Sequence, residues 1–285
     1  FDCSILSVKV SDENQDGEVY ITDGYDGILY AAKVGFYRTD RGFSIINNSW
    51  GSLYYNIFEQ ATIEVVHNDY NAIIIAAAGN DHQDQPHYPS SYEHVISVTA
   101  TDSSERVNWA TYHETVDLAS PGEGIESTII QNNPNNENAY DSWSGTSMAS
   151  PAAASVIGLL SSFNPDWGPD QLETMILATS DTIIYSINSE YLDGKLGQGR
   201  VDALRALSTP LFPKIELAEI DYQVITGDDS IIDAGEIVHL TTILYNNPDW
   251  GVASNPSITL NSVSEYFEIT NSNQDIDNIN PGDVY

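Results

Sequence analysis

Basic residues, cysteine and long apolar runs are what this sequence has least of. Its 285 residues include 9 lysines and arginines against 42 aspartates and glutamates, a formal net charge of −33. A surface of that sign repels nucleic acid and anionic lipid, so the sequence predicts neither as a partner. The acidic residues are spread along the chain, which is typical of solvation, as in a saline environment, and leaves calcium binding open.

Cysteine occurs once, as Cys3. A single cysteine excludes an intramolecular disulfide and a thiolate zinc cluster, and we expect a buried, inert thiol. No apolar run reaches about 18 residues, so no membrane insertion is predicted. The chain begins at Phe1, within a segment that is typical of a core strand. We therefore expect its natural start upstream, which leaves an export signal there open.

Apolar β-branched runs alternate with helical spacing in the first two-thirds of the chain. The predicted strands are residues 4–10, 44–48, 72–77 and 94–100, and the predicted helices between them are 27–37 and 54–68. This alternation predicts a doubly wound α/β fold with a mostly parallel sheet. A buried helix follows Ser147, and another is expected from Pro169 to Ala178.

The pattern changes near Thr209. Residues 209–214 are bracketed by two prolines and are typical of a linker, and strand-like segments follow at 216–225, 236–245 and 257–260. We therefore expect an α/β domain over residues 1–208 and a partial all-β sandwich over residues 215–285. The sandwich is expected to be completed beyond Tyr285.

The strongest chemical signal opens the buried helix and reads Ser144-Gly145-Thr146-Ser147-Met148-Ala149-Ser150-Pro151. A serine in the first turn of a helix lies near free backbone N–H groups, which suits a nucleophile whose attack creates an oxyanion. Gly145 permits close approach of a substrate. Taken alone, the same residues are more typical of a plain helix N-cap.

Several segments together resemble the subtilisin-like serine peptidases, in the same order and over roughly residues 4–207. The matching segments are Gly145 to Pro151, Asn47-Asn48-Ser49-Trp50-Gly51, Ala77-Ala78-Gly79-Asn80, Tyr88-Pro89-Ser90 with residues 95–100, residues 116–122 (Val-Asp-Leu-Ala-Ser-Pro-Gly) and residues 197–203 (Gly-Gln-Gly-Arg-Val-Asp-Ala). The order and spacing make coincidence a poor explanation.

The resemblance implies a serine endopeptidase that cleaves proteins or peptides through an acyl-enzyme at Ser147. It implies that Asn80 donates its side-chain amide to the oxyanion, together with the backbone N–H of Ser147. The implied substrate-binding residues are Ser49, Trp50, Gly51, Gly79, Gly145 and Thr146. No cofactor is expected for the chemistry, and we expect a monomer that is secreted or attached to the cell surface.

The sequence departs from the family at the other two triad positions. The family carries its aspartate in Asp-Ser/Thr-Gly and its histidine in His-Gly-Thr, and neither motif occurs here. Residues 5–10 resemble the strand that follows the histidine's helix, so both residues are expected upstream of Phe1 and the 285 residues alone are expected to be inactive. Trp50 replaces a smaller aliphatic residue, which leaves the shape of the substrate pocket open.

A calcium loop is one interpretation of Asp12, Asn14, Asp16 and Asp23, whose spacing suits oxygen ligands. The competing interpretation is a solvated turn between the first strand and the first helix. His82 and His87 are interpreted as polar surface because no acidic or thiolate ligand set accompanies them. Residues 228–236 resemble the opening of β-sandwich modules appended to secreted bacterial peptidases, or form only a turn.

Two rival functions remain. An inactive subtilisin-like module would keep the fold as a binding or structural platform, although retention of Ser147, Asn80 and Gly145 argues against it. An unrelated α/β hydrolase is the weaker rival, because no Gly-x-Ser-x-Gly sequence occurs.

Overall fold

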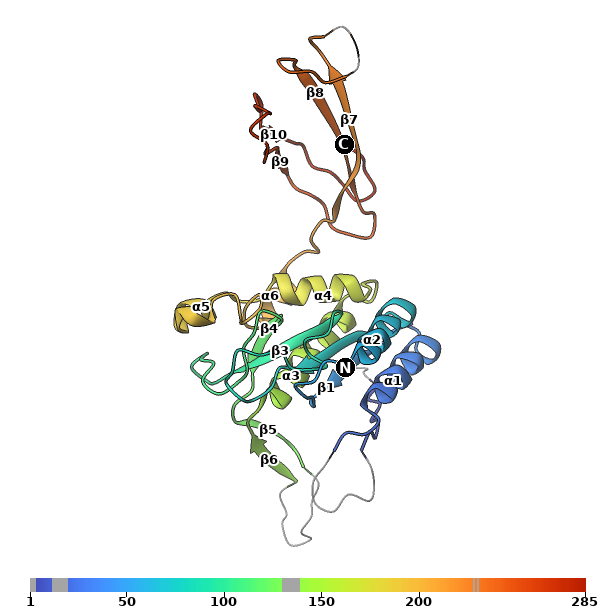
Figure 1. Ribbon diagram of the computed structural model, residues 1–285. Coiled ribbons are helices and arrows are strands. Elements are labelled where there is room, and N and C mark those ends of the chain that lie inside the picture. The colour runs from blue at the N-terminus through green and yellow to red at the C-terminus, as the bar shows by residue number, and fades with distance from the viewer. Residues whose placement is uncertain (1–3, 12–19, 130–138, 228, 230) are drawn as a thin grey trace. The chain divides into compact units, whose positions relative to one another are not determined.

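The structure, a computed structural model, describes residues 4–11, 20–129, 139–227, 229 and 231–285 (Figure 1). The chain divides into two compact units, Phe1–Thr209 and Pro210–Tyr285. No helix in the described part of the chain is long and apolar enough to cross a membrane.

The first unit is built on a four-stranded parallel sheet. Its strands follow one another in the order β1 (Ile45–Asn48), β2 (Ile73–Ala77), β3 (Val95–Thr101) and β4 (Leu118–Pro121). Every residue of β2 and β3 is buried. Such uninterrupted burial requires cover on both faces, and it explains why these strands are apolar throughout instead of alternating.

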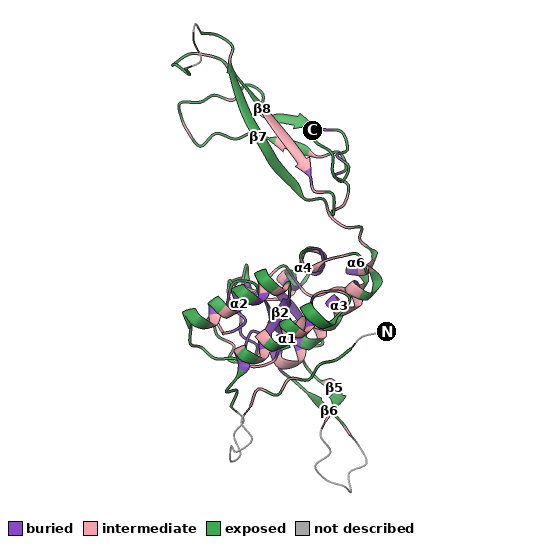
Figure 2. Ribbon diagram, turned by 90° about the vertical axis from the view of Figure 1, so that its right-hand side faces the viewer, coloured by how far each residue is buried: buried purple, intermediate pink, exposed green. Residues whose placement is uncertain are grey.

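Helices cover both faces of this sheet. On one face, α1 (Gly24–Arg38) and α2 (Ile57–Tyr70) form a common core with the strands, which contains residues such as Ile46, Ile74 and Ile63. On the other face, α3 (Thr146–Phe163) packs against all four strands. Figure 2 shows buried residues concentrated in the sheet and on the helices around it. The predicted α/β fold with a parallel sheet is confirmed.

The first unit also has several smaller elements. They are the exposed antiparallel hairpin β5 (Ile125–Thr128) and β6 (Tyr140–Trp143), the helices α4 (Pro169–Ala178), α5 (Ile184–Ile187) and α6 (Ala203–Ser208), and a 3₁₀ turn at Glu190–Leu192. The helix α4 has the predicted bounds, and Pro169 occupies its first turn, where proline's missing N–H costs nothing.

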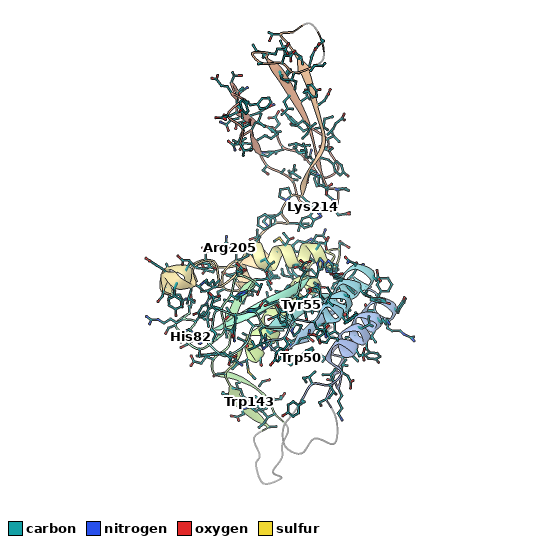
Figure 3. The ribbon with its side chains drawn as sticks, viewed as in Figure 1. Trp50, Tyr55, His82, Trp143, Arg205 and Lys214 are labelled. Carbon is teal, nitrogen blue, oxygen red and sulfur yellow. The ribbon has the colours of Figure 1, made fainter. Side chains whose placement is uncertain are left out.

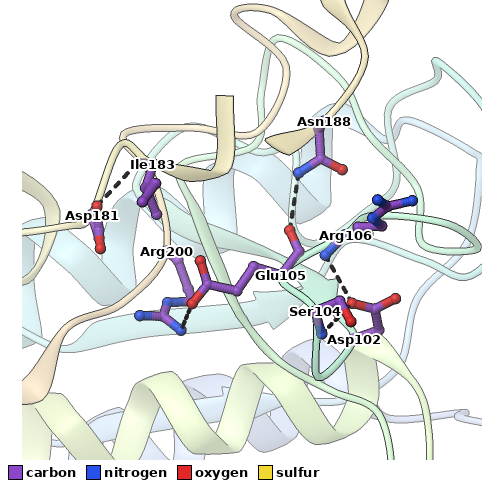
Figure 4. Close-up of polar contacts among 8 residues, drawn as sticks. All are labelled: Asp102, Ser104, Glu105, Arg106, Asp181, Ile183, Asn188 and Arg200. Atoms are coloured by element: carbon purple, nitrogen blue, oxygen red, sulfur yellow. Dashed lines mark hydrogen bonds and ion pairs between the residues drawn. The ribbon is translucent and has the colours of Figure 1, made fainter. Parts of the chain in front are cut away.

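The segment around Arg200 closes the first unit against β4. The N–H of Ala119 donates to Gly199 at 2.8 Å, and the carbonyl of Ala119 accepts from Val201 at 2.8 Å. Gly197 has φ +70, and a Cβ there would overlap the backbone of Asp117. Arg200 also forms an ion pair with Glu105 (Figure 4). The glycine and arginine of this motif therefore serve the packing of the fold.

The prediction of a strand over residues 4–10 is wrong, because the structure assigns no strand there. The antiparallel bridge nearby joins Ser11, the residue after this segment, to Ile21. Val8 and Val10 turn toward α1, where a Cβ on Gly27 would overlap the side chain of Val10. Alternating apolar residues therefore pack on a helix here, while Ile5 is 90% exposed.

The second unit contains two small antiparallel sheets, in agreement with the predicted all-β content. One pairs β7 (Ile215–Val224) with β8 (Val238–Asn246), and the other pairs β9 (Ser257–Thr259) with β10 (Asn273–Asp275). A small core of Ala253, Ile276 and Ile279 packs with partly buried Leu244 and Ile258.

A register shift in β7 lies between Leu217 and Glu219. Apolar residues alternate as Ile215 and Leu217 before the shift, and as Ile220, Tyr222 and Val224 after it. Because one additional residue restores the phase of a strand with a period of two, the shift keeps all five side chains on one face.

Candidate active site

Ser147 lies in the first turn of α3, where backbone N–H groups have no intrahelical acceptor. Its hydroxyl donates to the carbonyl of Ser49 at 3.3 Å, and the hydroxyl of Ser49 donates to the carbonyl of Ser147 at 2.9 Å. Ser147 is half-buried. The long bond from its Oγ is weak, so a base that reaches the hydroxyl can displace it.

A second pair of residues ties the end of β1 to α3. The hydroxyl of Ser150 donates to Asn47 Oδ1 at 2.7 Å, and Asn47 Nδ2 donates to Ser49 Oγ at 3.0 Å. Asn47 and Ser49 are two residues apart at a strand end, which places them on the same side of the sheet. The spacing of Asn47 and Ser49 is therefore the sequence signal for the contact between Asn47 and Ser150, which the family motifs alone do not predict.

Asn80 follows β2 and is oriented by Thr146. Asn80 Oδ1 accepts from the backbone N–H of Thr146 at 2.9 Å and from its hydroxyl at 3.1 Å. Thr146 Oγ1 also accepts from the N–H of Gly79 at 3.1 Å, and Thr146 is fully buried. Because both donors hold Oδ1, the amide Nδ2 of Asn80 points away from Thr146, and no acceptor among the described residues holds it.

These bonds leave two N–H donors near the helix turn that carries Ser147. One is the side-chain amide of exposed Asn80, and the other is the backbone N–H of Ser147 in the first helical turn. Donors held beside a nucleophile in this way can stabilise negative charge that develops on a substrate oxygen.

Gly145 precedes this turn and is buried, with an extended backbone. A Cβ at Gly145 would meet its nearest neighbour, Met148 Sδ, at 3.4 Å, which is ordinary contact. Folding therefore does not require glycine at this position, and the space it leaves lies within 3.8 Å of Asn80 Oδ1.

A model of the subtilase family matches residues 1–202. The chain belongs to this family. It is 33% identical over 208 residues to the halolysin-like extracellular serine protease Nep of Natrialba magadii, covering 73% of this chain and 34% of Nep. It is 37% identical over 160 residues to thermitase of Thermoactinomyces vulgaris, covering 56% of this chain and 52% of thermitase.

Solved structures show the same subtilase fold. A protease from Pseudoalteromonas arctica superposes with a TM-score of 0.55 at 25% identity, covering 65% of this chain and 57% of that protein. The prenylagaramide maturation protease PagA superposes with a TM-score of 0.55 at 22% identity, covering 67% of this chain and 69% of PagA. The present chain spans about a third to a half of the length of Nep and thermitase.

The side chain of Trp50 lies at the start of α1 in this subtilase (Figure 3). Its ring lies edge-on to Tyr25 with centroids 5.5 Å apart, and a Cβ at Gly24 would lie 2.5 Å from Trp50 Cη2. The backbone of Trp50 and Gly51 continues from Ser49 beside the nucleophile. The role of the six predicted substrate-binding residues stays a prediction.

His82 and His87 lie in different surroundings. His82 packs edge-on against Tyr112 with centroids 5.4 Å apart, and its Nε2 lies 3.4 Å from the hydroxyl of Tyr191. His87 is half-buried, and its Nδ1 lies 3.2 Å from the carbonyl of Ala77. Burial lowers the pKa of His87 below its ordinary value. Both rings are half-buried, and each packs on its own set of neighbours.

The calcium prediction rests mostly on residues outside the described part of the chain, namely Asp12, Asn14 and Asp16. Asp23 is exposed at the N-cap of α1, where its carboxylate accepts from Thr22 Oγ1 at 3.1 Å. The described residues contain no group of three His, Cys, Asp or Glu side chains that could hold a metal. Calcium binding therefore stays a prediction.

Two half-buried carboxyl groups lie outside this site. Asp117 accepts from the N–H of Ser97 at 2.8 Å, yet burial raises its pKa to about 6. Burial, followed by the charges of Asp117 and Asp170, raises the pKa of Glu173 to about 7. Neither group is bonded to Ser147 or Asn80, so both bear on stability instead of chemistry.

Proposed function

We propose that this chain belongs to a serine endopeptidase that hydrolyses peptide bonds in proteins through an acyl-enzyme at Ser147. The observation that carries the proposal is that Asn80 is bonded to Thr146, the residue before Ser147, in the helix turn that also presents the backbone N–H and the hydroxyl of Ser147. Membership of the subtilase family and relatives that are named as proteases support it.

In this proposal each group has one step. Ser147 Oγ attacks the carbonyl carbon as a base removes its proton, and the carbonyl oxygen becomes an oxyanion held by Asn80 Nδ2 and the Ser147 N–H. The amine leaves with the proton as the acyl-enzyme forms. Water then repeats the attack, the same base accepting its proton, and releases the carboxylate product and Ser147.

The base and its orienting carboxylate belong, in this proposal, to sequence upstream of Phe1. Among the described residues, the hydroxyl of Ser147 has the carbonyl of Ser49 as its partner and no imidazole. A serine without a base loses most of its rate. The 285 residues by themselves are therefore expected to be inactive.

The setting that fits this function is outside the cytoplasm, as a secreted or cell-surface protein acting on protein or peptide substrates. Support comes from the relative Nep, which is named as extracellular, and from the net charge of −33, which favours solubility. We propose a monomer, a sandwich module over residues 215–285, and structural calcium held by Asp12, Asn14, Asp16 and Asp23.

Labelling with a fluorophosphonate tests the proposal. The protein extended upstream to its natural start is compared with its Ser147→Ala variant, with Ser155→Ala as a control on an exposed serine of the same helix, and with residues 1–285 alone. We expect labelling of the extended protein and of Ser155→Ala only. Asn80→Ala should slow labelling by about 10²–10³-fold, because one oxyanion donor is lost.

The same experiment separates the rival function. If the folded, extended protein is neither labelled nor able to hydrolyse a protein substrate, the peptidase proposal fails. The chain would then be an inactive subtilisin-like module that serves as a binding or structural platform.

A further inference from the structure

The segment that precedes β3, residues 88–94, is attached to α2 at three points. At the first point, the hydroxyl of Tyr92 donates to Glu59 Oε2 at 2.7 Å. At the second point, the N–H of Glu93 donates to Gln60 Oε1 at 3.0 Å. Both points lie near the start of α2, so the third point decides whether the segment is also held at the other end of the helix.

A stacked pair of imidazoles, His67 and His94, forms the third point. The ring centroids are 4.1 Å apart, and the planes are 13° from parallel. His67 lies in the last turn of α2, two helical turns beyond Gln60 and therefore on the same face. A metal ion lies in the plane of each imidazole that binds it, and two nearly parallel rings share no such position. We therefore interpret the stack as a contact between α2 and the segment.

The position of the stack disfavours its protonation. Burial lowers the pKa of half-buried His67 below its ordinary value of 6.5, the charge of His94 lowers it further, and the charge of Asp170 in α4 partly offsets both. The other charged residues on the elements around the pair are Lys33 of α1, Glu64 and Asp69 of α2, and Glu93 of the segment. Because the folded state binds the proton less tightly, the stack stabilises it above pH 6.5, and this stability is lost as the pH falls through the lowered pKa.

The opposite end of the segment lies beside the candidate active site. The N–H of Tyr88 donates to the carbonyl of Ser52, and the N–H of Ser52 donates to the carbonyl of Tyr88, both at 2.7 Å. Ser52 follows soon after Ser49, whose hydroxyl donates to the carbonyl of Ser147. Opening of the stack would therefore loosen a segment that ends near the nucleophile.

We propose that His67 and His94 form an acid-sensitive lock between the end of α2 and the segment of residues 88–94. When at most one ring is charged, the rings stack and the segment is held at all three points. When both rings are charged, like charges face each other at 4.1 Å and the third point opens. The lock is independent of the proposed peptidase function, because it concerns the stability of the fold.

Peptide-resolved hydrogen exchange of the protein extended to its natural start tests the lock. The protection of the amides of residues 92–95 is measured at about pH 7.5 and about pH 5, at low ionic strength, where repulsion is screened least. His67→Phe keeps a ring that can stack and removes its charge. On going to the lower pH, we expect the wild type to lose at least about fivefold more protection than His67→Phe.

Two matched variants make the comparison specific. His94 and His82 both have a positive φ, of 67° and 48°, which asparagine also adopts readily. His94→Asn removes the other ring of the stack and should lose the pH dependence as His67→Phe does. His82 packs on Tyr112 instead, so His82→Asn should behave as the wild type. Protection of the β2 amides shows in every sample that the first unit is folded.

A wild type that loses no more protection at the lower pH than His67→Phe would overturn the inference. The same holds if His94→Asn keeps the pH dependence of the wild type, or if His82→Asn loses it. None of these results bears on the labelling of Ser147, so the peptidase proposal is tested separately.

Discussion

The strands of the two units lie in opposite environments. All five residues of β2 are buried, whereas in β7 every residue except half-buried Val224 is exposed. In the first unit, α1, α2 and α3 cover both faces of the sheet. In the second unit, the apolar face that the register shift aligns along β7 is largely exposed, with Ile220 at 56% and Leu217 at 53%.

This difference shows that apolar alternation alone confers little stability. Burial of apolar surface provides the driving force, at about 25 cal/mol per Å², and exposed strands provide almost none of it. The first unit should therefore resist local opening far better than the second. Peptide-resolved hydrogen exchange under denaturant reports the free energy of opening for each unit by itself.

The largest effect is expected from matched isoleucines. Ile75→Ala removes a side chain with 0% exposure from β2 and should lower the free energy of unfolding of the first unit by about 2–5 kcal/mol. Ile220→Ala in β7 should cost less than about 0.5 kcal/mol. Equal losses at the two positions, measured by hydrogen exchange, would break the comparison.

The half-buried carboxyl group of Glu173 gives the next effect, and it depends on pH. Because folding raises the pKa of Glu173 from 4.5 to about 7, the folded state holds its proton more tightly. The resulting stability is fully present below pH 4.5 and is lost as the pH rises through about 7. Glu173→Gln should therefore gain stability relative to the wild type over this range, by about 2–3 kcal/mol at pH 8.

The control for this prediction is Glu219→Gln on exposed β7, which should stay within about 0.5 kcal/mol of the wild type at every pH. Urea unfolding at several pH values between 4 and 8 provides the measurement. If the free energy of unfolding of Glu173→Gln depends on pH in the same way as that of the wild type, the carboxyl group of Glu173 is not the cause of the pH dependence.

Matched threonines give the smallest effect. Thr146→Val leaves the N–H of buried Gly79 without its acceptor and should lower the free energy of unfolding by about 1–3 kcal/mol. Thr146→Ser keeps the hydroxyl acceptor and should retain most of this stability. Thr226 also accepts a backbone N–H, from Ile237 at 2.7 Å, but it is exposed and water can replace it. Thr226→Val should lower the free energy of unfolding by less than about 0.5 kcal/mol, with both variants measured by hydrogen exchange.

Much of the first unit could be predicted because its elements are determined locally. Uninterrupted apolar runs identify β2 and β3, and Pro169 marks the start of α4. The structure of residues 4–10 could not be predicted in the same way. An alternating pattern does not reveal whether its apolar side packs on a strand or, as with Val10, on a glycine of a helix.

For the candidate site, sequence motifs identified Ser147, Asn80 and Ser49. The structure bonds Ser49 to Ser147 and Asn80 to Thr146, the residue before Ser147. The catalytic roles of these residues stay predictions. The place of His87 could not be predicted, because it depends on two loops that meet only after β1 and β2 pair. The residues around a histidine in a polar loop do not indicate which distant residues its ring will contact, here Gly51 and Gly79.

The helix α3 links the chemistry to the rest of the first unit, because it begins at the Thr146–Ser147 turn and lies across all four strands. The nucleophile therefore has no hinge of its own. Heat should not inactivate Ser147 before the sheet melts, so the temperature at which labelling is lost should coincide with the calorimetric transition of this unit. Fluorophosphonate labelling of the protein extended to its natural start would then report the thermal unfolding of this unit.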